Sequence, residues 1–239
     1  MLFFNRNLAT PEENLAVEEA WLDMAEEGLA SDEILRVWQP TTPMVVVGRG
    51  SRLSLEVDAT AAAAARVPIL RRVSGGAAIV TGPGCLMYAI MLSYDRRPHL
   101  RMLDQAHQAV MQAWLAALRP LEPRITWDGT CDLVVDARKV SGNSLRCRRD
   151  WMLYHGTLLL DMDLGLVNQF LLHPPREPEY RQGRPHADFV ANLHIDAQAL
   201  IANLCQAWAA EQREPTFPRD RIDRLVRERY SNSQWNFQR

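Results

Sequence analysis

The sequence is almost devoid of lysine. Lys139 is the only lysine among 239 residues, whereas arginine occurs 26 times. A general drift toward arginine would remove lysine wherever positive charge alone is needed, so chance retention and a specific need are the two explanations for Lys139. Unlike a guanidinium, an ammonium is a compact point charge with three rotatable donors. Position 139 therefore suits contact with a phosphate oxygen or a small carboxylate in a tight pocket.

Cysteine is also scarce, and long apolar runs are absent. Cys85, Cys131, Cys147 and Cys205 lie far apart without a CxxC pair, which argues against a zinc site and a dense disulfide framework and favours reduced thiols. No run approaches the ~18 apolar residues of a membrane span, and the amino terminus lacks the apolar core of a signal peptide. The sequence predicts a cytoplasmic protein without a membrane partner.

An excess of basic charge is missing too. The formal net charge is -2, whereas nucleic-acid binders usually show a basic stripe. The local cluster Arg146-Cys147-Arg148-Arg149 is equally well explained as a solvated strand end. We therefore expect no nucleic-acid partner.

The pattern of apolar residues predicts one α/β (α+β) domain with mixed β-sheets flanked by helices. Thr10 and Pro11 provide an N-cap and a first-turn proline for the first helix. Helices are expected over 11–28, 58–66, 99–118, 163–172, 196–211 and 219–230, and strands over 33–38, 43–48, within 68–95 and within 125–160. Segment 173–188 has four prolines and is expected to be a long loop, of the kind that often forms a lid or a partner surface.

Two short glycine-containing stretches carry the chemical signal. Arg71-Arg72-Val73-Ser74-Gly75-Gly76 follows an expected strand, and its backbone N–H groups can approach an anion closely because glycine has no Cβ. The second stretch is Lys139-Val140-Ser141-Gly142, which places the lone ammonium beside another point of close approach. Each stretch alone is also compatible with an ordinary turn.

Together with three further stretches, these motifs resemble the catalytic domain of the lipoate-protein ligase A family, in the biotin ligase and lipoyl/octanoyl transferase fold group. The matching pieces are RRVSGGAA (71–78), CDLVVDARKVSGNS (131–144), YHGTLLLDMDL (154–164), FVANL (189–193) and YSNSQWNF (230–237). Their order and spacing fit the family over nearly the whole chain. The resemblance implies a class II synthetase/biotin ligase-like fold over 1–239 as a single domain, without a C-terminal accessory domain.

The resemblance also implies an activity. Such ligases use ATP and Mg²⁺ to convert lipoate to lipoyl-AMP, then transfer the acyl group to a lysine of a lipoyl carrier domain, such as an E2 domain or a glycine-cleavage H-like protein. Lys139 would be the catalytic residue that contacts the carboxylate and the α-phosphate. Substrate and ATP would be bound by Arg72, Ser74, Gly75, Gly76, Ala77, Ala78, Ile79, Val80, Asp132, Lys139, Ser141, Gly142, His155 and Gly156, with Asp132 also a candidate Mg²⁺ ligand.

The sequence departs from the family pattern at the expected nucleotide end. Ala77 replaces the third glycine, Thr81-Gly82 replaces a histidine-aspartate pair, and cysteines replace two asparagines at 85 and 131. A separate accessory protein is a further expected partner for activation. His155 could act as a base or could be a structural imidazole, and Gly156 could let the dithiolane chain pass.

Two alternative functions remain open. An octanoyltransferase would hold the acyl group on a cysteine thiolate and need no ATP, but the two positions that such enzymes use correspond to Met152 and the vicinity of Arg124. Cys131 and Cys147 keep this alternative open. A non-catalytic lipoyl-domain binding protein would explain the altered loop after Gly76, although it would not need an amine at position 139.

Overall fold

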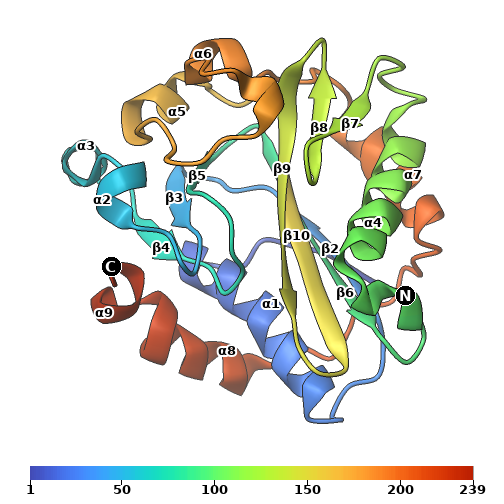
Figure 1. Ribbon diagram of the computed structural model, residues 1–239. Coiled ribbons are helices and arrows are strands. Elements are labelled where there is room, and N and C mark those ends of the chain that lie inside the picture. Colours follow the sequence, from blue (N-terminus) through green and yellow to red (C-terminus); the bar gives the residue numbers. More distant parts are fainter. Residues whose placement is uncertain (239) are drawn as a thin grey trace.

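A seven-stranded sheet forms the centre of the molecule, as the computed structural model shows for residues 1–238 (Figure 1). The strands run in the spatial order β1-β2-β6-β10-β9-β8-β7. β1 pairs with β2 in parallel, and the other neighbours pair antiparallel. The strands are β1 (Leu2–Asn5), β2 (Ile34–Trp38), β6 (Cys85–Ser93), β7 (Thr126–Asp128), β8 (Asp132–Val135), β9 (Arg138–Cys147) and β10 (Trp151–Leu159).

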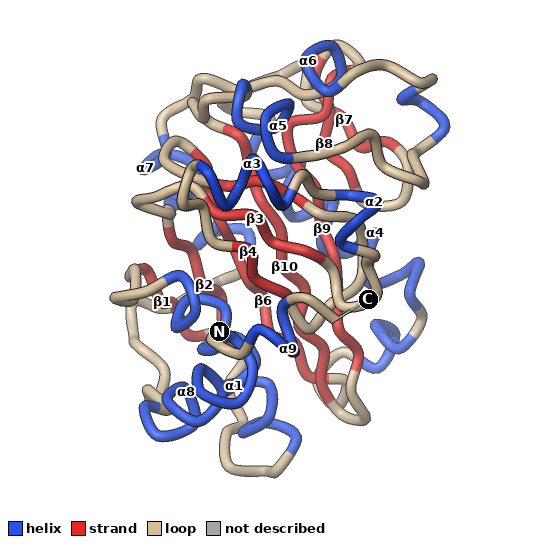
Figure 2. The backbone as a smooth tube through the Cα atoms, turned by 90° about the vertical axis from the view of Figure 1, so that its left-hand side faces the viewer, coloured by secondary structure: helices blue, strands red, loops and turns tan. Residues whose placement is uncertain are grey.

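A second sheet of three short strands packs over one face of the first (Figure 2). β3 (Met44–Val47) lies between β4 (Ile69–Arg71), to which it is parallel, and β5 (Ile79–Thr81), to which it is antiparallel. Both sheets carry parallel and antiparallel pairs, so the expected mixed α/β fold is confirmed.

Helices cover both faces of the large sheet. The helices are α1 (Pro11–Glu26), α2 (Leu53–Glu56), α3 (Ala59–Ala64), α4 (Leu103–Leu118), α5 (Gly165–Phe170), α6 (His186–Phe189), α7 (Ala197–Ala207), α8 (Arg219–Leu225) and α9 (Ser233–Asn236), with short helical turns η1 (Pro98–Arg101), η2 (Glu179–Arg181) and η3 (Val226–Tyr230). α1 starts as expected, because the Thr10 side chain accepts the Glu13 N–H and Pro11 needs no acceptor. No helix of the described chain is long and apolar enough to cross a membrane.

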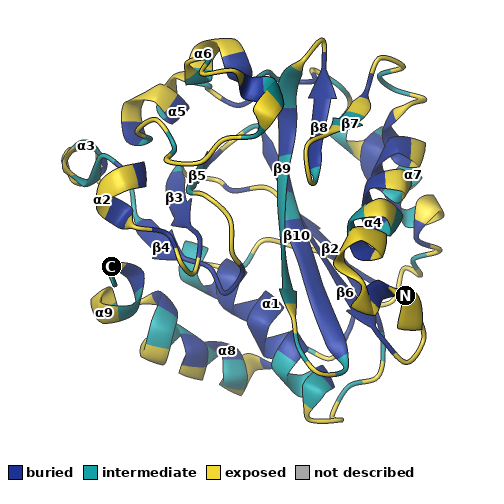
Figure 3. Cartoon of the chain, viewed as in Figure 1, coloured by how far each residue is buried: buried dark blue, intermediate teal, exposed yellow. Residues whose placement is uncertain are grey.

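Alternating side chains of the central strands divide the core into two layers. On β6, Met87, Ala89 and Met91 face α1 and the small sheet, whereas Tyr88 and Ile90 face α4 and α7. Every residue of β6 is buried, which explains its unbroken apolar sequence (Figure 3). The site described below lies in the first of these layers.

Three expectations about local structure need correction. The segments 33–38 and 43–48 do form strands, but β2 and β3 belong to different sheets, so the turn between them crosses from one layer to the other. Both strands are fully buried and carry no alternation that would assign them to one sheet. α2 was not expected, and the loop 173–188 contains η2 and the start of α6.

Candidate active site

A cavity of about 210 Å³ lies between the two sheets. The expected site residues that line it are Arg72, Gly76, Ala77, Ala78, Ile79, Val80, Lys139, Ser141, Gly142, His155 and Gly156. Ser74, Gly75 and Asp132 do not line it, although each bonds or adjoins a residue that does. The structure thus brings residues from β5, β9, β10 and the loop between β4 and β5 together around one space.

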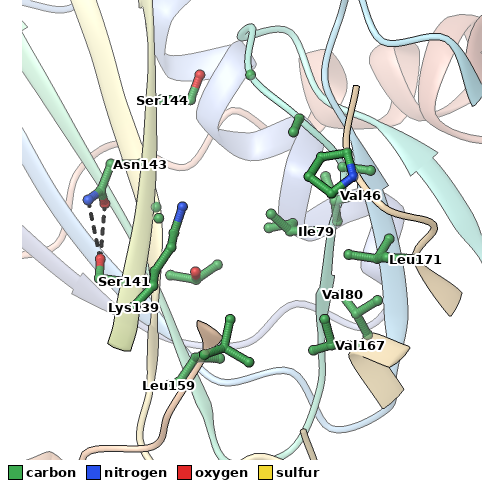
Figure 4. Close-up of a pocket in the computed structure, with 18 of the residues that line it drawn as sticks. Val46, Ile79, Val80, Lys139, Ser141, Asn143, Ser144, Leu159, Val167 and Leu171 are labelled. Carbon is green, nitrogen blue, oxygen red and sulfur yellow. Dashed lines mark hydrogen bonds between the residues drawn. The ribbon is translucent and has the colours of Figure 1, made fainter. Parts of the chain in front are cut away.

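One part of the cavity wall is apolar. Side chains from both sheets and from α5 and its C-terminal end converge there, as Figure 4 shows for Val46, Val80, Leu159, Val167 and Leu171. Such a wall suits a ligand with a hydrocarbon chain, because pockets gain most of their affinity from apolar contact and orient the ligand with few polar groups.

Lys139 brings its ammonium to the polar part of the cavity. Its Nζ lies 2.8 Å from Asp132 Oδ1 across the β8-β9 hairpin, and Tyr180 donates its hydroxyl to Asp132 Oδ2 at 2.9 Å. A register shift between Leu133 and Val134 interrupts the hairpin beside these residues. The Lys139 side chain is still 27% exposed, so the ammonium is paired but remains accessible from the cavity.

Gly142 leaves the space that the Lys139 side chain fills. A Cβ at position 142 would lie 2.9 Å from Lys139 Cε and 3.0 Å from Nζ. Gly142→Ala is therefore expected to displace the ammonium and to slow lipoyl-AMP formation about 10- to 100-fold. Because the obstructing atoms end a flexible side chain, the free energy of unfolding should fall by less than about 1 kcal/mol.

The matched control for this variant is Gly50→Ala. A Cβ at Gly50 meets no atom within 4 Å, so this variant should keep the wild-type rate. Single-turnover measurement of lipoyl-AMP on both variants decides the point, and an unimpaired Gly142→Ala protein would contradict the assigned position of the ammonium.

The glycine loop, residues 74–78, turns its carbonyl groups toward the protein. Arg72 and the hydroxyls of Ser51 and Ser144 donate to the carbonyl oxygens of residues 75–77 at 2.6 to 3.1 Å. The N–H groups of residues 75–77, in contrast, have no hydrogen-bond acceptor among the described residues. Successive free amides of this kind attract an anion such as a phosphate.

Arg72 is the residue that holds this loop. Its side chain is buried, and burial lowers its pKa from the ordinary value to about 10, while the nearby Glu56 carboxylate opposes the shift. Gly76 has a φ of +85°, and a Cβ there would lie 2.9 Å from Arg72 Nη2, so a larger residue fits neither the backbone nor the space. A direct contact of Arg72 with ligand stays a prediction.

His155 belongs to a buried polar chain that crosses the core layer. Its Nδ1 lies 2.7 Å from Glu18 Oε2, and its Nε2 lies 2.5 Å from Ser74 Oγ. Glu18 Oε1 in turn lies 3.0 Å from Arg36 Nη1. Both ring nitrogens of His155 are thus engaged with protein groups. Whether His155 has a structural role or acts as a base stays open.

Gly156, on β10, leaves space for a side chain of the neighbouring strand β9. A Cβ at position 156 would lie 1.9 Å from Asn143 Oδ1 and 2.7 Å from Gly142 O. The missing side chain therefore makes room for Asn143, which pairs with Gly156 across β9 and β10. That an acyl chain passes Gly156 stays a prediction.

The polar residues missed from sequence include Glu18 and Glu56, which line the cavity, and Arg36 and Tyr180, which contact Glu18 and Asp132. A signal existed for one of them, because Glu18 follows Leu15 by three positions and precedes Leu22 by four, on the buried side of α1. An acidic residue on the buried side of a helix needs a buried hydrogen-bond or ion-pair partner. The other three depend on contacts between elements distant in sequence.

None of the four cysteines lines the cavity. Cys85 is buried, and burial raises its pKa to about 12; burial and the Asp132 charge raise the pKa of Cys131 to about 11. Cys147 is exposed at the end of β9, and burial also raises the pKa of Cys205. A thiolate nucleophile requires a lowered pKa and access to substrate. The pKa is raised, not lowered, in Cys85, Cys131 and Cys205.

Asp132, the candidate Mg²⁺ ligand, is already paired within the protein. No group of three His, Cys, Asp or Glu side chains among residues 1–238 could hold a metal ion, and both Asp132 oxygens already accept from Lys139 and Tyr180. Mg²⁺ often binds through one or two carboxylates together with substrate phosphates. A role for Asp132 in such a shared site stays a prediction.

These features define the class of the protein. Residues 10–211 match the family model described as the lipoyl protein ligase A/B catalytic domain, so the chain belongs to this family. The resemblance noted in the sequence is thereby confirmed.

Curated relatives include both enzyme types. The chain is 28% identical to lipoate-protein ligase 1 of Staphylococcus aureus over 79% of its own length and 55% of that protein. It is 24% identical to the octanoyltransferase LipM of Brevibacillus brevis over 96% of each chain. It is 31% identical to a putative lipoate-protein ligase A of Aeropyrum pernix over 68% of its length and 59% of that protein. The chain thus spans little more than half of these two ligases but nearly all of LipM.

Solved structures confirm the fold. A bi-partite lipoate protein ligase of Thermoplasma acidophilum, described with its E2 lipoyl domain, superposes with a TM-score of 0.81 at 21% identity and covers 99% of this chain and 95% of that one. A lipoate-protein ligase A bound with ATP has a TM-score of 0.79 at 20% identity and covers 99% of each chain. At such identities the likeness establishes the architecture alone.

Proposed function

We propose that this protein is a lipoate-protein ligase, which activates lipoate with ATP to lipoyl-AMP and transfers the acyl group to a lysine of a lipoyl carrier domain. The observation that carries the proposal is one cavity with an apolar wall, a single ammonium and a loop of free amides, and with no thiol. Each part matches one need of the reaction: the hydrocarbon chain, the carboxylate and the phosphates.

The ligand is expected to lie with its hydrocarbon chain along Val46, Val80 and Leu159 and its carboxylate near Lys139. The free amides of residues 75–77 would receive phosphate oxygens of ATP. The solved relatives bound with lipoic acid and with ATP support this reading, because they share the fold.

The proposed reaction has two chemical steps, each of which is a nucleophilic substitution. A carboxylate oxygen attacks the α-phosphorus, the bond to the bridging oxygen breaks, and pyrophosphate leaves with its electron pair. The amine of the carrier lysine, after losing a proton to solvent, then attacks the acyl carbon, and AMP leaves. Lys139 would stabilise the negative charge on the carboxylate and α-phosphate oxygens in both steps, while Mg²⁺ bound with ATP would supply further positive charge.

An octanoyltransferase is the second candidate, because the chain and the LipM relative cover nearly the whole of one another. Its mechanism requires a thioester on a cysteine beside the acyl chain. The absence of cysteine from the cavity wall weighs against it. A non-catalytic binding role has less support, since it does not explain the ammonium of Lys139 in the cavity.

A variant with all four cysteines replaced by serine or alanine separates these mechanisms. Cys131, Cys147 and Cys205 would become serine, and the buried Cys85 would become alanine. We expect it to transfer lipoate in the presence of ATP and Mg²⁺ at no less than about one third of the wild-type rate, because thiols take no part.

The readout is the mass of an apo lipoyl carrier domain after incubation with lipoate or with an octanoyl carrier, with and without ATP. Circular dichroism verifies that the variant is folded. ATP-independent octanoyl transfer by the wild type that disappears in the cysteine-free variant would establish the transferase instead.

The proposed protein partner is an apo lipoyl carrier domain of the E2 or glycine-cleavage H type. The E2 lipoyl domain named with the Thermoplasma acidophilum ligase supports this choice, and the description of that ligase as bi-partite supports a separate accessory protein as a second partner. The assay is therefore run alone and with such a protein added.

A further inference from the structure

Glu56 places a carboxylate in the wall of a cavity that is proposed to bind two anionic groups. It is the last residue of α2, is 7% exposed and lines the cavity. The Leu172 N–H donates to the Glu56 carbonyl at 3.0 Å, and Val57 bridges to Leu171, so the backbone at Glu56 is fixed against the end of α5. A carboxylate beside an anion site repels the anion, so the presence of Glu56 in this wall calls for another explanation.

The contacts of Glu56 indicate that role. Its Oε2 accepts the Ala78 N–H at 2.6 Å and lies 3.1 Å from Ser51 Oγ. Ser51 Oγ also lies 3.0 Å from Gly76 O. Glu56 and Ser51 thus hold the segment 76–78 at both of its ends.

These contacts set which backbone groups of the loop are already bonded within the protein. The carbonyls of residues 75–77 bond to Arg72, Ser51 and Ser144, and the Ala78 amide bonds to Glu56. The amides of residues 75–77 are left without an acceptor among the described residues. Without Glu56, the peptide unit between Ala77 and Ala78 keeps only the bond from Arg72 to its carbonyl, and the three preceding amides lose one of the two contacts that fix their orientation.

The charge of Glu56 adds to this effect. Arg72 is a buried cation whose nitrogens bond to carbonyl oxygens and one hydroxyl. Glu56 is the carboxylate that stabilises its charged form. One side chain therefore supports the loop directly and also through Arg72.

We propose that Glu56 is a positioning residue for ATP, which holds the glycine loop with the amides of residues 75–77 directed at the phosphates. This inference rests on the proposed function. It assigns Glu56 no contact with substrate and no proton transfer.

Glu56→Ala and Glu56→Gln form the test. In lipoyl-AMP formation, Glu56→Ala is expected to raise KM for ATP at least tenfold while KM for lipoate changes less than twofold. Glu56→Gln keeps an oxygen acceptor for the Ala78 amide, so its KM for ATP should return to within about threefold of wild type. The exposed Glu211 provides the control variant, Glu211→Ala, which should behave as wild type.

A second readout does not depend on ATP. Hydrogen exchange in the ligand-free protein should be at least tenfold faster at the Ala78 amide in Glu56→Ala, and close to wild type in Glu56→Gln. Unchanged exchange, or an equal rise of both KM values, would overturn the inference. A wild-type protein that forms no lipoyl-AMP while the exchange difference is found would instead refute the proposed function and leave the loop contact standing.

Discussion

Replacing Lys139 with arginine is expected to lower the rate of lipoyl-AMP formation by ~10²–10³-fold. The guanidinium is planar and larger than the ammonium, and the Lys139 side chain already lies between Asp132, at 2.8 Å from Nζ, and Gly142, where a Cβ would come within 3.0 Å of Nζ. Arginine keeps the charge but cannot keep it at the same point. Single-turnover formation of lipoyl-AMP measures the effect.

Stability should hardly change in this variant. The Lys139 side chain is 27% exposed, so the free energy of unfolding should stay within about 1 kcal/mol of wild type. Arg119→Lys is the control variant. It exchanges the same two residue types at the exposed C-terminal end of α4, so its rate and stability should match those of the wild type. A Lys139→Arg protein with near-normal turnover would remove the ammonium from the mechanism.

Replacing Arg36 with methionine is expected to lower the free energy of unfolding by ~3–5 kcal/mol, because removing one partner of a buried ion pair leaves an uncompensated charge. The Arg36 side chain is fully buried, Glu18 is 5% exposed, and their N and O atoms lie 3.0 Å apart. Arg36 also donates to the backbone and side-chain oxygens of Asn14 at 2.7 and 2.5 Å. Urea denaturation provides the measurement.

A double variant separates charge from packing. Glu18→Gln keeps an acceptor for His155 and removes the charge, so the Arg36→Met/Glu18→Gln protein should recover at least half of the loss. The control is Arg6→Met. Arg6 pairs with Glu214, and the two side chains are 55% and 56% exposed, so this variant should lose less than about 1 kcal/mol. Equal losses from Arg36→Met and Arg6→Met would contradict the buried network.

Local sequence revealed the centre of the site. Lys139 stood out by composition, and the glycine loop and the Ser141-Gly142 pair were marked by glycine, whose close approach to other groups is a property of the residue itself. The structure places all of these around one cavity. Sequence alone was sufficient here because each signal lies within a few neighbouring positions.

The supporting contacts could not be predicted in the same way. Glu18 meets His155 from 137 positions away, and Tyr180 meets Asp132 from 48. Such pairs depend on how the layers pack, and no spacing rule encodes that packing. The Glu56–Ala78 contact spans 22 positions and likewise required knowing that α2 lies beside the glycine loop.

The division of β2 and β3 between two sheets shows the same limit at the level of the fold. Every residue of both strands is buried, so their sequences identify strands without identifying their partners. The consequence for function is direct, because the cavity exists only where the small sheet packs over the large one.

The mass of an apo lipoyl carrier domain, incubated with this protein and lipoate, tests the central claim most directly. We predict a lipoyl adduct that requires ATP and Mg²⁺, persists in the cysteine-free variant and forms ~10²–10³-fold more slowly in Lys139→Arg. No adduct with or without an accessory protein, or an adduct that forms without ATP, would contradict the assignment as an adenylate-forming ligase.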